Sequence, residues 1–183
     1  MPRYVAFLRA INVGGHIVKM DQLRKLFTEL GLTEVETFIA SGNVLFTSSS
    51  KSGPALEKKI EKHLKAALGY EVATFVRTAA EVCQAAAHEP FSAAVMKAPY
   101  HNLYVSFLRD APPSTAKRAV EAMRSPNDEF HINARELYWL SRVPFSESKV
   151  NGALLEKTIG GPATMRGLTT VRKLAAKCAD AAK

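Results

Sequence analysis

The chain has 183 residues, of which 47% are hydrophobic and 23% are charged, and its formal net charge is +8 at pH 7. This balance excludes a disordered chain, and a chain of this length can fold without disulfides or a metal. The positive charge is spread over both halves, so it favours anionic partners in general and selects none. No run approaches the roughly 18 apolar residues of a membrane span, and no signal peptide opens the chain. We therefore expect a cytoplasmic protein that does not enter the membrane.

The first half alternates strand and helix patterns. Apolar residues recur at helical spacing in 20–30, and Gly31 can end that helix with a left-handed backbone. Thr78 and Glu81 have the spacing of a capping box, which predicts a helix start. We expect strands at 4–10, 35–39, 44–47 and 72–76, and helices at 20–30, 52–68 and 78–88.

The second half repeats this order after a connector at 90–100 that contains Pro90 and Pro99. We expect strands at 103–108, 129–132, 136–140 and 163–166, and helices at 112–123, 151–158 and 171–179. The domain limits predicted from this pattern are 1–89 for the first half and 101–183 for the second.

The repeat is also visible in the residues. Tyr4-Val-Ala-Phe-Leu-Arg9 matches Tyr104-Val-Ser-Phe-Leu-Arg109 at five of six positions, and Ala73-Thr74 echoes Ala163-Thr164. We therefore predict an α+β fold formed by internal duplication of two ferredoxin-like βαββαβ halves, each with an added C-terminal helix.

The loop at 10–18 of the first half is longer than the corresponding loop of the second half. The numbering offset between the halves is 100 at their first strands and falls to about 93 at their third strands. The extra residues of the first half are expected in the loop at 10–18, where the second half has only 110–113. Because a loop that the repeat does not need is free to carry function, we regard it as the first candidate site.

Several motifs resemble a known family. Tyr4-Val-Ala-Phe-Leu-Arg-Ala-Ile-Asn-Val-Gly-Gly15 and Ser41-Gly-Asn-Val44 resemble the bacterial family called domain of unknown function (DUF) 1697. The resemblance continues through Arg135-Glu-Leu-Tyr-Trp139 to Pro162-Ala-Thr-Met-Arg166. It implies a duplicated ferredoxin-like α+β protein and does not imply any particular activity. Gly167-Leu168 stands where the family usually has Asn-Trp.

The glycine-rich loop permits two interpretations. Backbone N–H groups of Gly14 and Gly15, placed between a strand and a helix, could hold a phosphate or another small anion. The alternative is a flexible turn in which glycine only supplies a positive φ. The residues expected at a ligand site are Arg9, Asn12, Gly14, Gly15, Lys19, Ser41, Asn43 and Arg166.

Other functions stay open as alternatives. The charge allows nucleic-acid binding, but Tyr138 and Trp139 do not fit the aromatic strand motif of RNA-binding sheets. A catalytic Ser41 would need a neighbouring base, and the sequence places no histidine beside it. Cys83 and Cys178 are expected as free buried thiols, with a disulfide as the alternative. No metal-ligand spacing or cofactor motif is present, so neither is expected, and an enzyme of another kind or an interaction module remains possible.

Overall fold

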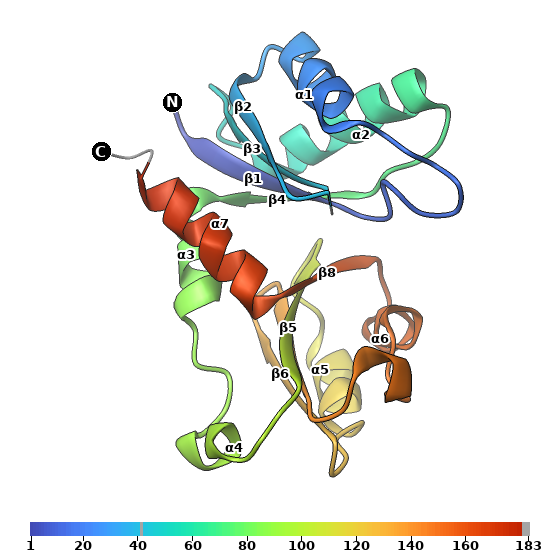
Figure 1. Ribbon diagram of the computed structural model, residues 1–183, viewed down its shortest axis with the longest axis vertical. Coiled ribbons are helices and arrows are strands. Elements are labelled where there is room, and N and C mark those ends of the chain that lie inside the picture. Colours follow the sequence, from blue (N-terminus) through green and yellow to red (C-terminus); the bar gives the residue numbers. More distant parts are fainter. Residues whose placement is uncertain (41, 181–183) are drawn as a thin grey trace. The chain divides into compact units, whose positions relative to one another are not determined.

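The computed structural model describes residues 1–40 and 42–180. Contacts divide the chain into two compact units. The first unit is Met1–Cys83 with the described part of the segment that begins at Leu174, and the second is Gln84–Lys173. Each unit contains a four-stranded antiparallel sheet with two helices packed on one face (Figure 1). The two-half α+β fold expected from the sequence is confirmed.

The first unit has the strand order β2-β3-β1-β4. Its strands are β1 (Arg3–Leu8), β2 (Thr33–Phe38), β3 (Asn43–Thr47) and β4 (Thr74–Thr78). Its helices are α1 (Met20–Glu29), α2 (Gly53–Leu68) and the beginning of α3 (Ala79–Ala87). The capping box is confirmed, because Glu81 N–H donates to Thr78 Oγ1 over 3.1 Å and Thr78 N–H donates to Glu81 Oε2 over 2.8 Å.

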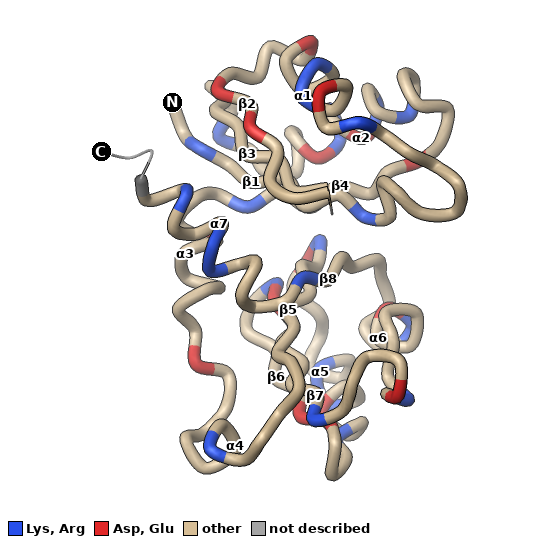
Figure 2. The backbone as a smooth tube through the Cα atoms, in the orientation of Figure 1, with Lys and Arg blue, Asp and Glu red and all other residues tan. Residues whose placement is uncertain are grey.

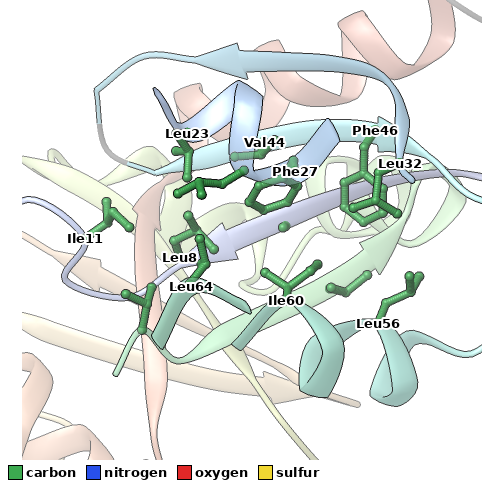
Figure 3. Packing of buried hydrophobic residues seen from close by; sticks show 14 of the residues in the cluster. Leu8, Ile11, Leu23, Phe27, Leu32, Val44, Phe46, Leu56, Ile60 and Leu64 are labelled. Carbon is green, nitrogen blue, oxygen red and sulfur yellow. The ribbon is translucent and has the colours of Figure 1, made fainter. Parts of the chain in front are cut away.

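Alternation along β1 decides which side chains form the first core. Successive side chains of a strand point to opposite faces, so Tyr4, Ala6 and Leu8 share the face that α1 and α2 cover. The helical stripe of α1 supplies Leu23 and Phe27 to the same cluster, as Figure 3 shows. Apolar residues of α2 and β3 complete it: Leu56, Ile60, Leu64, Val44 and Phe46.

The face of the first sheet opposite α1 and α2 carries Val5 and Phe7, and the C-terminal segment contacts the edge strand β2. Lys177 of α7 (Leu168–Asp180) donates to Glu36 of β2, and its Nζ lies 5.6 Å from the centroid of the Phe38 ring. Cys83 Sγ lies 3.8 Å from the carbonyl oxygen of Ala175. Val5 and Phe7, which point to this face, are completely buried. The side chains of β1 are therefore apolar and buried on both faces of the sheet.

The second unit repeats the order as β6-β7-β5-β8. Its strands are β5 (Asn102–Leu108), β6 (Asp128–Asn133), β7 (Glu136–Ser141) and β8 (Ala163–Gly167). Its helices are α4 (Ala93–Lys97), α5 (Ser114–Glu121), the 3-10 turn η1 (Phe145–Glu147), α6 (Gly152–Ile159) and the first residues of α7. The short helix α4 lies within 90–100, the segment expected as a connector, and the side chain of Ser92 caps it by accepting the N–H of Val95.

Aromatic residues of β7 point to both faces of the second sheet. Trp139 is buried on the face of α5 and α6, and its Nε1–H donates to Asp128 Oδ1 over 2.9 Å. Tyr138 points to the other face, where its hydroxyl donates to the carbonyl oxygen of Ala85 over 3.0 Å. Because both rings are buried and hydrogen-bonded, neither is available in this structure to stack on a base.

The sheet register corrects one detail of the repeat. Thr74 pairs with Leu8, whereas Ala163 pairs with Leu108. The echo of Ala73-Thr74 in Ala163-Thr164 is therefore displaced by one residue in the fold. The domain limits at 89 and 101 are not decided by the contacts and stay a prediction.

Charged residues of both signs are distributed along both units (Figure 2). Among residues 1–40 and 42–180, no helix has the length and apolarity that would let it cross a bilayer.

Candidate functional site: the loop between β1 and α1

Two apolar residues anchor the loop between β1 and α1 to the first core. Ile11 and Val18 are 3% and 4% exposed and belong to the buried cluster around β1. The hydroxyl of Tyr70 donates to the carbonyl oxygen of Ile11 over 3.0 Å. The loop is thus held at Ile11 and Val18, and residues 13–17 between these anchors are exposed.

Asn12 joins the loop to the turn between β2 and β3. Its Oδ1 accepts the N–H of Val18 over 2.7 Å, and its Nδ2 donates to the carbonyl oxygen of Ala40 over 3.2 Å. At the end of β1, the N–H of Leu8 donates to Gly42 O over 2.8 Å. Asn12 therefore positions the loop, and both of its polar side-chain atoms are used by the protein.

Gly14 and Gly15 form the exposed tip of the loop. Their φ angles are +65° and +86°, and nothing lies within 4 Å of the place where a Cβ would stand. Neither N–H group donates to another residue within the described part of the chain. The helix α1 begins at Met20, as expected from the sequence, so the two glycines lie five residues or more before the helix start. Any anion would therefore meet the loop's own N–H groups and not the end of a helix.

The loop has basic and apolar side chains and no acidic one. Arg9 and Lys19 are exposed, and residues 9–19 contain no Asp or Glu. The ring of His16 stacks on Tyr70 with centroids 3.8 Å apart. Val13 and Ile17 are 56% and 85% exposed. The loop thus combines positive charge, open backbone donors and exposed apolar side chains.

The other predicted site residues have different environments. Asn43 is completely buried, and its Nδ2 donates to the carbonyl oxygen of Phe38 over 3.0 Å, which is a structural role at the hairpin. Ser41 lies outside the described residues. Arg166 is a residue of β8 in the second unit, and nothing assigns it to the loop.

Arg166 is buried within its strand. Its Nη1 donates to Thr164 Oγ1 over 2.9 Å and to Met165 O over 2.8 Å. Burial lowers the pKa of the guanidinium, because removal from water penalises the charged form. Arg77, which was not predicted as a site residue, has the same position in β4 and is also buried. The strand register reveals this equivalence, because Arg77 pairs with Val5 and Arg166 pairs with Val105. The match of Ala73-Thr74 with Ala163-Thr164 would align the two strands one residue out of register.

The corresponding place in the second half contains a cavity. A space of about 290 Å³ is lined by Arg109, Asp110 and the two prolines that precede α5, together with residues 159–162. In the first half the longer loop inserts Ile11 and Val18 into the core at the equivalent end of the sheet. The extra residues therefore complete the core of their own half as well as forming an exposed tip.

The cysteines form no disulfide. Cys83 and Cys178 are both free, and burial raises the pKa of the Cys178 thiol to about 11, with the neighbouring Cys83 adding to the effect. In the described part of the chain, no group of three or more His, Cys, Asp or Glu residues could hold a metal ion.

Comparison with known proteins identifies the family. The family model described as protein of unknown function (DUF1697) matches residues 1–138. The chain belongs to the DUF1697 family. Among solved structures, this DUF1697 chain is similar to the conserved bacterial protein SP0830 from Streptococcus pneumoniae, with a TM-score of 0.76 and 24% identity over 98% of this chain and 99% of that one. At this identity the likeness shows the fold alone. No curated protein matches the chain.

The departure from the DUF1697 pattern at Gly167-Leu168 has a structural consequence. Gly167 pairs with Tyr104, and Thr78 pairs with Tyr4, so the two have the same place before an added helix. Thr78 caps α3 with its hydroxyl, whereas Gly167 has no side chain with which to cap α7.

Proposed function

We propose that this DUF1697 member is a cytoplasmic binding protein whose Gly14-Gly15 loop holds a small anionic or phosphate-bearing ligand. The observation that carries the proposal is the pair of consecutive glycines with positive φ and open N–H groups. Successive N–H groups of a loop can form a concave donor set for an anion.

The surroundings of the glycine pair support an anion and not a cation. Arg9 and Lys19 lie at the two ends of the loop, and no carboxylate lies between them. Asn12 holds the loop against the hairpin, so the backbone of the loop is already ordered before a ligand binds. Preorganisation of this kind lowers the entropic cost of binding.

The proposal can be tested by calorimetric titration with inorganic phosphate, pyrophosphate and nucleotides. Binding should be weakened by Lys19→Gln, which removes a cation, and by the double change Gly14→Ala and Gly15→Ala, which disfavours the positive φ. Lys25→Gln, on the exposed side of α1, and Gly31→Ala, at another open positive-φ position, are matched controls. Absence of binding for every anion, or equal loss in the controls, would contradict the proposal.

A second candidate function is protein binding through the same surface. Val13, Ile17 and Ile39 are 56%, 85% and 51% exposed, and Asn12 joins the loop to the hairpin that carries Ile39. Exposed apolar side chains that gather in this way are typical of interaction sites. In that case Ile17→Ser would abolish association with a partner, while Lys19→Gln would change only the association rate and its salt dependence.

A nucleic-acid partner is a weaker alternative for this fold. The net charge of +8 supports it, but the buried Tyr138 and Trp139 supply no aromatic platform on the second sheet. Binding to RNA that disappears at moderate salt and shows no sequence preference would be non-specific electrostatic attraction.

A further inference from the structure

The second unit contains a cavity that none of the predicted site residues lines. It has a volume of about 300 Å³ and lies among the segment that follows α3, the helix α4, the start of β5 and the start of α7. Its apolar wall is formed by Phe91, Met96, Leu103 and Leu168. A space of this size is at the lower end of the range for small-molecule sites.

Two charged side chains of opposite sign line the same cavity. Glu89 and Arg172 are both exposed, and they come from segments far apart in the sequence. Within residues 1–40 and 42–180, neither makes an ion pair or a side-chain hydrogen bond, either with the other or with a third residue. Both charges are therefore free to contact a ligand that carries both signs.

The ring of His88, which lines the cavity, has one buried nitrogen. Among the described residues, His88 Nε2 has no hydrogen-bond partner, while the ring packs against His131 and Tyr138 with centroids 5.4 Å and 5.0 Å away. Buried polar atoms are normally hydrogen-bonded, because an unpaired one loses its contacts with water and gains nothing. Because this nitrogen is buried, His88 contributes only its ring to the cavity wall, and the polar contacts are left to Glu89 and Arg172.

We propose that this cavity binds an apolar α-amino acid. Its carboxylate pairs with Arg172, its ammonium group pairs with Glu89, and its side chain lies among Phe91, Met96 and Leu168. Arginine suits the carboxylate because its planar guanidinium can donate two parallel hydrogen bonds. An apolar carboxylate without an amino group would leave Glu89 unpaired, and an amine would leave Arg172 unpaired, so the zwitterion fits both charges. The site is separate from the glycine loop and does not depend on its function.

The test uses the full chain and three related ligands. L-Phenylalanine is compared by calorimetric titration with 3-phenylpropionate, which lacks the ammonium group, and with phenethylamine, which lacks the carboxylate. The wild-type protein should bind L-phenylalanine most tightly. Arg172→Gln should weaken L-phenylalanine binding by about tenfold or more and leave phenethylamine binding unchanged, and Glu89→Gln should leave 3-phenylpropionate binding unchanged.

A pair of variants on α4 tests the location. Ala93 is exposed and lines the cavity, so Ala93→Trp should block binding while leaving the core intact. Ala94→Trp, at the next exposed position of the same helix, should bind like the wild type. The proposal is overturned if L-phenylalanine, L-leucine and L-methionine all fail to bind at millimolar concentration. It is also overturned if 3-phenylpropionate binds as tightly as L-phenylalanine, or if Ala93→Trp changes nothing.

Discussion

Arg77 and Arg166 have the same position in the two sheets. Arg77 pairs with Val5 of β1, and Arg166 pairs with Val105 of β5, the residue equivalent to Val5 in the repeat. Each guanidinium donates from Nη1 to the carbonyl oxygen of the preceding residue, at 3.0 Å to Val76 and 2.8 Å to Met165. The fold thus keeps a buried arginine at one register position in both halves.

This equivalence predicts equal sensitivity to substitution. Arg77→Lys and Arg166→Lys should each lower the free energy of unfolding by about 1–3 kcal/mol, because an ammonium group cannot reproduce the planar donor set and leaves buried acceptors unpaired. Urea unfolding measures the effect. Arg118→Lys on exposed α5 is the control and should change stability by less than about 0.5 kcal/mol. Loss at only one of the two positions would contradict the equivalence.

A glycine at the β2–β3 turn is required by its contacts. A Cβ at Gly42, where φ is +77°, would stand 2.8 Å from Ile11 Cγ2 and 3.0 Å from Leu8 Cβ. Gly42→Ala should therefore lower the free energy of unfolding by about 2–4 kcal/mol, because the left-handed backbone and the overpacking both destabilise the variant. Gly31→Ala, where φ is +75° and nothing is within 4 Å, should lose only about 1 kcal/mol. Equal losses in thermal unfolding would mean that the contact with Ile11 is unimportant.

The buried indole of the second core depends on one carboxylate. Asp128 is 5% exposed, and its two oxygens accept from Trp139 Nε1 at 2.9 Å and from Ser125 Oγ at 2.7 Å. Asp128→Ala should lower the free energy of unfolding by about 2–3 kcal/mol, because it leaves the buried indole N–H without an acceptor. Asp128→Asn keeps an acceptor oxygen and should cost less. Tryptophan fluorescence during urea unfolding reports both, and an Ala variant as stable as the wild type would show that the bond contributes nothing.

Burial of Cys178 predicts a loss of stability in alkaline solution. The residue is 2% exposed, and burial raises the pKa of its thiol from 9.0 to about 11. Above pH 9 the unfolded chain releases this proton while the folded chain keeps it, so the free energy of unfolding falls as the pH rises from 9 to 11. The contribution of this group to the free energy of unfolding reaches about 3 kcal/mol at most. Urea unfolding at pH 8, 9 and 10 measures this dependence, and in Cys178→Ala the free energy of unfolding should fall less with rising pH. If it falls as steeply as in the wild type, other groups cause the loss of stability.

Local patterns were sufficient to predict most of the elements. The capping box of Thr78 and Glu81, and the left-handed glycines at 31, 69 and 160, depend only on residues close in sequence, so helix limits were predicted nearly correctly. The extra loop was found because the repeat has fewer residues there in its second half. Its anchoring by Asn12 could not be predicted, since the acceptor at Ala40 is distant in sequence.

The sequence by itself determined the two-half α+β order, because hydrophobic period and capping are local properties. Only the tertiary structure decided which distant residues share a position or a face. It showed that Arg77 corresponds to Arg166 and that the segment from Leu174 groups with the first sheet. It also brought Glu89 and Arg172 to one cavity. These relationships depend on strand register and on packing between distant segments, and the spacing of nearby residues predicts neither of them.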